Sequence, residues 1–299
     1  MLTSTTIEIR GLSKTFGAVR AVNDLSFSVP PGTVTGFLGP NGAGKTTTLR
    51  ILLGLVRPSA GTATFSGTNY RDLAHPLATV GTALEASSFH PGRSARDHLA
   101  VYAAAAGIAQ HRVDDVLTQV GLAEQCDRRV SGYSLGMRQR LGLAFALLGD
   151  PGVLVLDEPV NGLDPEGIKW IRSFLRTLAS EGRTVLISSH LLSEVQQSVD
   201  RVVIIRKGEL VYDGGIAELE GVPSVVADSP RRAELESALV AAGTTVRVGD
   251  EGLTITGASA TRIGEIALRA GIPLSRLGDA QPGLESAFLE LVQDREEQQ

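Results

Sequence analysis

A glycine-rich segment, GPNGAGKT at residues 39–46, constrains this chain more than any other part of its sequence. It directly follows the short apolar run Val34–Leu38, and after it apolar residues recur at helical spacing, at Leu49, Leu52, Leu53 and Val56. Strand, glycine loop and helix, in that order, favour phosphate binding, because glycines let backbone N–H groups curl around an anion and the helix points its positive end at it. An ordinary glycine-rich turn is the alternative, which the correctly placed strand and helix disfavour.

The side chains of this segment have separate expected roles. Lys45 is expected to reach the β- and γ-phosphates of a nucleotide as a point charge, and the Thr46 hydroxyl to sit on Mg²⁺. The nucleotide-binding residues predicted here are Gly39, Asn41, Gly42, Ala43, Gly44, Lys45, Thr46 and Thr47. By itself, such a loop indicates only that a nucleotide is bound.

Two neighbouring carboxylates suggest what is done with the nucleotide. The apolar run Val153–Leu156 is typical of a buried strand, and Asp157 and Glu158 follow it. Asp157, at the strand's end, is placed to hold the Mg²⁺ shell. Glu158 can polarise a water molecule for in-line attack on the γ-phosphate. A solvated acidic turn would be the favoured interpretation in isolation, but the phosphate-binding loop makes it the weaker one.

Apolar strands alternate with helical stretches over the first 220 residues. The strands Val153–Leu156 and Thr184–Ser188 flank a helical stretch at Glu166–Ser180, and another strand is expected at Arg201–Ile205. Residues 93–149 are expected to be mostly helical. Buried apolar strands that alternate with helices predict an α/β fold around a mixed, largely parallel sheet.

The composition changes after Leu219, so two domains are predicted: residues 1–220, with a helical part at about 86–150, and residues 221–299. The tail is expected to contain strand, helix, two strands, helix and a short strand near Leu274–Leu277, followed by a helix at Leu284–Val292. Without that last helix the order is βαββαβ, which is typical of a small α+β domain.

Charge and composition exclude several classes of protein. Residues 1–220 carry 21 basic and 21 acidic side chains, whereas residues 221–299 carry 7 and 12, so the tail supplies the net charge of −5. Because no basic stripe is present, no nucleic-acid partner is expected. A single cysteine, Cys126, excludes a disulfide framework. No apolar run approaches the ~18 to 20 residues of a membrane-spanning helix, and no signal peptide is recognisable, so we expect an intracellular protein that does not insert into a membrane.

A third motif identifies a family. The segment at 133–140, YSLGMRQR, resembles the signature motif of ABC-transporter ATPases, usually LSGGQ, and Ser134 lies 23 residues before Asp157, as in that family. Asn161–Asp164 resembles the family's D-loop, and His190 its switch histidine. Phe16 is similar to the aromatic residue that stacks on adenine. The resemblance covers residues 5–220 and implies the P-loop ABC ATPase fold, ATP as the nucleotide and Mg²⁺ as the metal.

The resemblance also implies a head-to-tail homodimer, in which ATP lies between the phosphate-binding loop of one subunit and the signature motif of the other. Ser134 and the N–H groups around Gly136 would then supply anion-binding donors across the interface, with Asp164 of the D-loop nearby. Glu158 and His190 are the catalytic residues on this interpretation.

Three residues depart from the family pattern. Leu135 replaces the first glycine of the signature motif, and Met137 replaces its glutamine. Glu85 occupies the place of the Q-loop glutamine, where a carboxylate could ligate Mg²⁺ or could point away towards a partner. These departures resemble the branch of bacterial type-2 exporters that includes peptide-antibiotic immunity and drug-resistance ATPases, and the tail resembles the C-terminal domain of many drug-export ATPases.

The expected function is therefore that of the ATP-hydrolysing subunit of an exporter. A separate integral membrane permease would carry a drug, peptide antibiotic or lipid-like compound, with this chain peripheral on the cytoplasmic face of a bacterial membrane. Two alternatives are a soluble ABC ATPase acting on ribosomes or DNA and a catalytically silent nucleotide sensor. The single phosphate-binding loop and the absence of Cys-rich inserts disfavour the first, and the presence of Glu158 and His190 disfavours the second.

Overall fold

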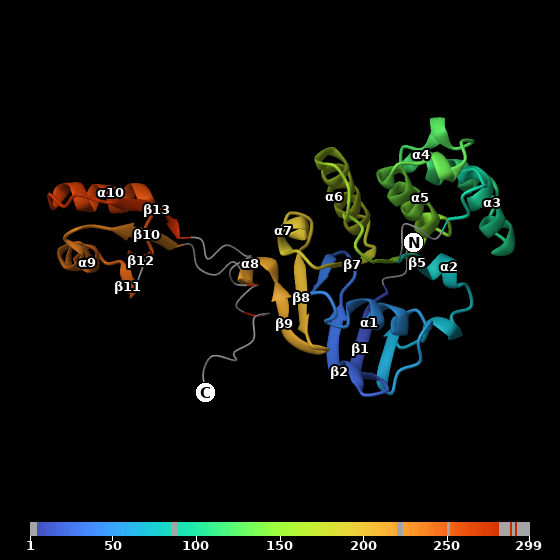
Figure 1. Ribbon diagram of the computed structural model, residues 1–299, viewed down its shortest axis with the longest axis horizontal. Coiled ribbons are helices and arrows are strands. Elements are labelled where there is room, and N and C mark those ends of the chain that lie inside the picture. The colour runs from blue at the N-terminus through green and yellow to red at the C-terminus, as the bar shows by residue number, and fades with distance from the viewer. Residues whose placement is uncertain are drawn as a thin grey trace. The chain divides into compact units, whose positions relative to one another are not determined.

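The computed structural model describes residues 5–84, 89–219, 224–249 and 252–280, together with Phe288 and Leu291. The chain divides into two compact units, Met1–Ile216 and Ala217–Glu290, with Leu291 grouped with the first. Figure 1 shows their helices and strands, with many of them labelled. Among the described residues, no helix combines the length and the apolar character needed to cross a bilayer.

A six-stranded sheet forms the centre of the first unit. Its order is β5 (Val80–Ala83), β6 (Val153–Leu156), β7 (Thr184–Ser189), β3 (Val34–Leu38), β8 (Arg201–Arg206) and β9 (Glu209–Gly215). All neighbouring pairs are parallel except β8 and β9. Every residue of β3, β6 and β7 is buried, which explains their continuous apolar character. The predicted α/β fold with a mixed, largely parallel sheet is confirmed.

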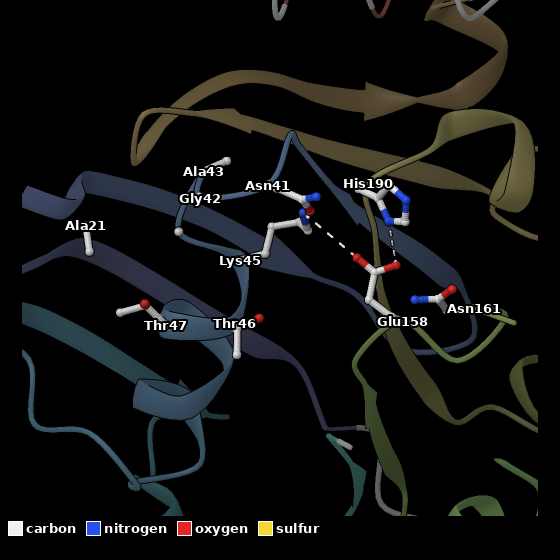
Figure 2. A pocket seen from close by; sticks show the side chains of 11 residues that line it. Ala21, Asn41, Gly42, Ala43, Lys45, Thr46, Thr47, Glu158, Asn161 and His190 are labelled. Atoms are coloured by element: carbon white, nitrogen blue, oxygen red, sulfur yellow. Dashed lines mark hydrogen bonds and ion pairs between the residues drawn. The ribbon is translucent and has the colours of Figure 1, made fainter. Parts of the chain in front are cut away.

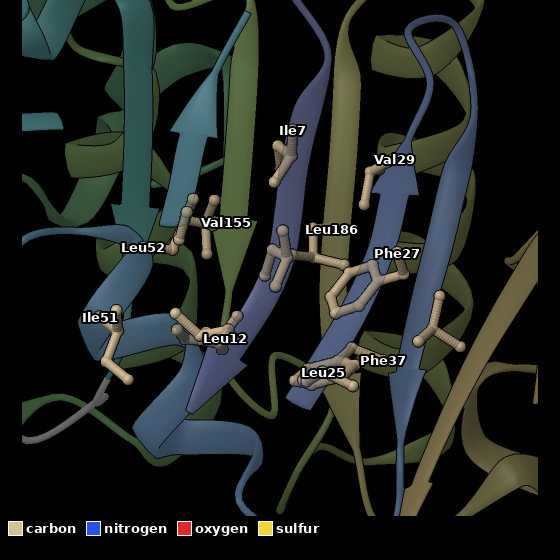
Figure 3. Close-up of a cluster of buried hydrophobic side chains, with 14 of the residues drawn as sticks. Ile7, Leu12, Leu25, Phe27, Val29, Phe37, Ile51, Leu52, Val155 and Leu186 are labelled. Atoms are coloured by element: carbon tan, nitrogen blue, oxygen red, sulfur yellow. The ribbon is translucent and has the colours of Figure 1, made fainter. Parts of the chain in front are cut away.

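A smaller antiparallel sheet faces the first one across the main core (Figure 3). It has the order β2 (Val19–Val29), β1 (Ile7–Phe16) and β4 (Ala60–Phe65). Apolar side chains from this sheet pack against those of β3, β6 and β7 and of the helix α1 (Lys45–Leu52), and the rings of Phe27 and Phe37 lie 5.2 Å apart between centroids. This core holds the end of β3 and the start of α1, and hence the glycine-rich loop between them.

The helix α1 is shorter than the spacing of leucine and valine predicts. It ends at Leu52, because Gly54 adopts a φ of 69° and reverses the chain. The N–H groups of Leu55 and Val56 then bond back to the carbonyl oxygen of Arg50. A glycine in this left-handed conformation is a common helix end, so the expectation that the helix runs on to Val56 was wrong.

Three helices make up the helical part of the first unit: α3 (Ala95–Ala105), α4 (His111–Gln119) and α5 (Leu135–Leu147), which pack on one another, with α5 also against β5 (Figure 1). On the main sheet, α6 (Pro165–Ser180) and α7 (Leu192–Val195) pack against β7. The shorter elements are η1 (Tyr70–Asp72), α2 (Pro76–Thr79), η2 (Ala123–Gln125), η3 (Val130–Gly132) and α8 (Ile216–Leu219).

The second unit has the predicted βαββαβ order. It contains β10 (Ser224–Asp228), α9 (Arg232–Ala241), β11 (Thr245–Gly249), β12 (Gly252–Thr256), α10 (Ala260–Arg269) and β13 (Arg276–Ala280). The sheet is antiparallel throughout, in the order β11, β12, β10, β13, and its core includes Leu235, Leu253 and Ile263. The last strand begins two residues later than the sequence predicts. Apart from Phe288 and Leu291, the helix expected at 284–292 lies outside the described residues.

Candidate active site

The glycine-rich loop leads from the end of β3 into the first turn of α1. Gly44 caps α1 at a φ of 104°, and a Cβ on it would lie 2.4 Å from the carbonyl oxygen of Ala21. A Cβ on Gly39 would come equally close, 2.4 Å, to the carbonyl oxygen of Ile205. Neighbouring backbone therefore requires glycine at both positions, and the loop can follow its path only with these residues.

A cavity of about 520 Å³ lies over this loop (Figure 2). The residues that line it come from β2, from the loop, from α1 and from the segments that follow β6 and β7: Ala21, Asn41, Gly42, Ala43, Gly44, Lys45, Thr46, Thr47, Glu158, Asn161 and His190. The fold thus brings both predicted catalytic residues to the predicted nucleotide-binding loop. Asn161 was expected only as part of the D-loop, and Ala21 was not expected here.

Lys45 places its ammonium group in the wall of this cavity. Its Nζ donates to the carbonyl oxygen of Gly39 at 2.6 Å and lies 4.0 Å from Oε1 of Glu158. Burial lowers the pKa of Lys45, while the negative charges of Glu158 and Asp157 act to raise it. An anion entering the cavity would meet an ammonium group that is already partly desolvated, and such a charge interacts more strongly than one in bulk water.

Thr46 and Asp157 meet at the edge of the main sheet. The Thr46 hydroxyl donates to Oδ2 of Asp157 at 3.1 Å, and the Ser188 hydroxyl donates to Oδ1 of the same carboxylate. Hydroxyl and carboxylate oxygens are the ligands that Mg²⁺ prefers. Beside a glycine loop shaped for phosphate, this donor set fits a Mg²⁺–nucleotide complex. Glu85, the third expected Mg²⁺ ligand, lies outside the described residues.

The Glu158 carboxylate lies between two other functional side chains, with Lys45 on one side and His190 on the other (Figure 2). Nδ1 of His190 is 3.0 Å from its Oε2. The backbone of Glu158 adopts a φ of 49°, rare for a residue with a side chain, and its N–H donates to the Ser188 hydroxyl at 3.0 Å. The arrangement presents a held carboxylate to the cavity, as a base acting on water would need.

The residues of the signature motif line a second cavity, of about 290 Å³, between the first turns of α5 and α6. Ser134 caps α5 by accepting the N–H of Met137 at 3.2 Å, and Asp164 caps α6 by accepting the N–H of Gly167 at 2.8 Å. Gly136 lines the same cavity. None of these three predicted residues lines the cavity over the glycine loop, so within one chain they form a group separate from the loop residues, and Phe16 lines neither cavity.

Phe16 and Leu135 are both markedly exposed. Phe16 ends β1 with 49% of its surface exposed, and the ammonium group of Lys14 lies 4.7 Å from the centroid of its ring. Leu135 is 47% exposed, and a Cβ on Gly162 would lie 2.3 Å from its Cδ2. The leucine that replaces a glycine of the signature motif therefore packs against the D-loop glycine.

Comparison with known proteins decides the family. The family described as "ABC transporter" matches residues 22–161, which include the loop, the signature motif and Glu158. The "Bacitracin transport ATP-binding protein BcrA" of Enterococcus faecalis is 37% identical over 301 residues, covering 98% of each chain. The chain belongs to the ATP-binding proteins of ABC transporters. It is therefore an ATPase of that family, with ATP as the nucleotide.

Two further similarities support this ABC assignment. The "Lantibiotic transport ATP-binding protein SrtF" of Streptococcus pyogenes is 38% identical over 214 residues, which is 70% of this chain and 92% of that one. A solved "Structure of ATP binding subunit of ABC transporter" superposes with a TM-score of 0.65 at 25% identity, covering 73% of this chain and 92% of that one. Residues 223–285 match a family described as a "Domain of unknown function".

Proposed function

We propose that this ABC ATPase binds ATP with Mg²⁺ in the cavity over the glycine loop and hydrolyses it to power export through a separate membrane-spanning permease. The observation that carries the catalytic part is the Glu158 carboxylate, held between Lys45 and His190 at the edge of that cavity. The transport part is supported by the full-length similarity to a transport ATP-binding protein.

Backbone and side-chain groups in and beside the cavity have separate tasks in this proposal. The N–H groups of Gly42 and Gly44 face the phosphates, and Lys45 neutralises charge on the γ-phosphate. Thr46 and Asp157 would hold Mg²⁺, with Glu85 as a third proposed ligand from the sequence, and the ion would supply positive charge that offsets the negative charge on the phosphates.

Glu158 and His190 act on the attacking water. Glu158 accepts a proton as the water oxygen bonds to the γ-phosphorus atom, and the bond from that atom to the bridging oxygen of the β-phosphate breaks, which leaves inorganic phosphate and ADP. His190, bonded to the other carboxylate oxygen, keeps Glu158 aimed at the cavity. The 3.0 Å contact between His190 and Glu158 is sufficient for this positioning role.

The two separate groups of predicted binding residues support a homodimer closed by ATP. Ser134, Gly136 and Asp164 line the second cavity and would contact ATP held by the loop of a second copy. The N-termini of α5 and α6 would face the negative charge of that ATP. Phe16, at the end of β1 and half exposed, is proposed to stack on the adenine ring.

The exported compound is proposed to be a peptide antibiotic or another drug or lipid-like compound, because transport proteins for bacitracin and a lantibiotic are similar to this chain. The chain would lie on the cytoplasmic face of a bacterial membrane, bound to its permease. Residues 221–299 are proposed to form an accessory domain that affects dimer contacts or coupling to export.

The experiment is to express the full chain, with the membrane protein encoded by the adjacent reading frame, in a bacitracin-sensitive bacterium. We expect bacitracin tolerance to rise, and Lys45→Ala to abolish the increase at equal expression. The same assay with a lantibiotic separates the two peptide classes. Unchanged tolerance to both peptides, with the chain bound to ribosomes or DNA instead of the membrane fraction, would contradict the transport proposal.

A further inference from the structure

We propose that Ser188 is a positioning residue, whose hydroxyl holds the backbone of Glu158 and the carboxylate of Asp157 in their working arrangement. This inference rests on the proposed function, since it assumes that Glu158 is the base. It concerns a residue that the sequence motifs leave without a role.

Ser188 lies near the end of β7 and is fully buried, with no exposed surface. Its Oγ accepts the N–H of Glu158 at 3.0 Å and donates to Oδ1 of Asp157. A hydroxyl can accept and donate at the same time, which neither an alanine nor an apolar side chain can do. A single oxygen atom therefore ties together the proposed metal ligand and the proposed base.

The backbone conformation of Glu158 explains why its hydrogen bond to Ser188 matters. With φ at 49°, Glu158 is in the left-handed region, where a residue with a side chain is strained. Such a conformation persists when the surrounding structure holds it, and a buried N–H group requires an acceptor. The Ser188 hydroxyl supplies that acceptor at the strained residue itself.

Two residues near the end of β7 contact Glu158. Ser188 holds its backbone N–H, and His190, two residues further on, contacts its carboxylate at 3.0 Å. β6 and β7 are parallel neighbours, with Leu156 paired to Ile187, so the next residues along the two strands, Asp157 and Ser188, come side by side. Loss of the Ser188 hydroxyl would free the backbone of Glu158 to turn and would move its carboxylate relative to the cavity.

The test compares Ser188→Ala with Thr184→Val in the full chain, assayed with Mg·ATP. Thr184 is also fully buried on β7, and its hydroxyl bonds to the carbonyl oxygen of Thr5, far from both carboxylates. We expect Ser188→Ala to lower kcat by ~10- to 100-fold, the range known for residues that orient metal ligands, while the affinity for ATP changes by less than ~3-fold. Thr184→Val should keep most of the wild-type kcat. Equal losses of kcat in the two variants would overturn the proposal.

A second comparison separates positioning from general stability. In a Glu158→Gln background, adding Ser188→Ala should lower the remaining turnover by clearly less than it lowers that of wild type, because the part of its effect that passes through Glu158 is already lost. If Ser188→Ala lowers kcat as much in the Glu158→Gln background as in wild type, Ser188 does not act through Glu158. If Glu158→Gln alone leaves hydrolysis unchanged, the proposed function is wrong. If Glu158→Gln lowers kcat but the Ser188 variants keep the wild-type kcat, the proposed function stands and only the inference about Ser188 is wrong.

Ser188→Cys is the second variant if Ser188→Ala does not fold, because it keeps a polar atom at the end of the side chain at the cost of a somewhat larger volume. A thiol is a weak donor and a weak acceptor, so kcat should again fall. Wild-type kcat in this variant would overturn the proposal.

Discussion

At the scale of single residues, the wall of the cavity places an ammonium group beside a carboxylate. Lys45 is buried, and its Nζ lies 4.0 Å from Glu158 while also bonding to the carbonyl oxygen of Gly39. These contacts keep the charge in place when no phosphate is near. A γ-phosphate would compete for the same ammonium group, so the cavity is arranged to exchange one set of oxygen partners for another.

Lys45→Ala removes this charge. We expect ATPase turnover of the full chain to fall to less than ~10% of wild type, because little is left to neutralise the γ-phosphate. Lys169→Ala, which removes an exposed lysine of α6, is the control and should keep wild-type turnover. Turnover of Lys45→Ala near that of the control would show that the lysine does not have the assigned role.

Site residues could be predicted where the features that define them lie close together in the sequence, and could not where they depend on contacts between distant segments. The loop residues could be assigned from the sequence, because glycine positions, strand and helix all lie within one short segment. Ser188 could not, because its contacts depend on the register of β6 against β7. The one available signal was its position at the end of a strand, where side chains of neighbouring parallel strands meet.

At the scale of elements, the contact between α5 and β5 joins the helical part of the first unit to its main sheet. Gly81 of β5 makes this approach possible, since a Cβ there would lie 2.0 Å from the carbonyl oxygen of Ala146. The bounds of β6 are those that its apolar run predicts. The pairing of β5 with β6 did not follow from it, because nothing local in a four-residue strand specifies its neighbour.

Gly81→Ala should therefore destabilise the first unit by ~1–3 kcal/mol, the usual effect of forcing extra atoms into a packed interior. Gly278→Ala in β13 is the matched control, because a Cβ there meets nothing within 4 Å. Its effect should stay within ~0.5 kcal/mol. Urea unfolding of both full-length variants measures the difference, and equal midpoints would contradict the close packing of β5 on α5.

At the scale of the whole molecule, the residues that line the two cavities all belong to the first unit. The second unit has its own core, which includes Leu239 and Ile255. The order of its elements could be predicted because each strand and helix is short and regular. The strand order β11, β12, β10, β13 could not, since it depends on contacts between distant segments.

Truncation after Leu219 should leave ATP binding intact, because a unit with its own core keeps its fold. We expect the affinity of the shortened chain for ATP to lie within ~2-fold of the full-length value, measured by titration calorimetry. A ten-fold weaker affinity would show that the second unit takes part in the nucleotide site.

The proposed homodimer gives a prediction of its own. Blocking hydrolysis while ATP stays bound should trap the closed dimer, so Glu158→Gln should elute as a dimer from a sizing column in Mg·ATP and as a monomer in Mg·ADP. Adding Ser134→Arg, which places a large side chain in the second cavity, should prevent the dimer. An Mg·ATP-independent dimer, or a monomer throughout, would count against closure by ATP.

The most direct test of the central claim, that Glu158 is the base of an ATPase, is the turnover of Glu158→Gln. The amide keeps the size of the side chain but cannot take a proton from water, so we expect kcat to fall by ~10²-fold or more with ATP affinity unchanged. Hydrolysis is measured as phosphate release from Mg·ATP by the purified full chain, beside wild type and Lys169→Ala. Phosphate release by Glu158→Gln at the wild-type rate would contradict the account.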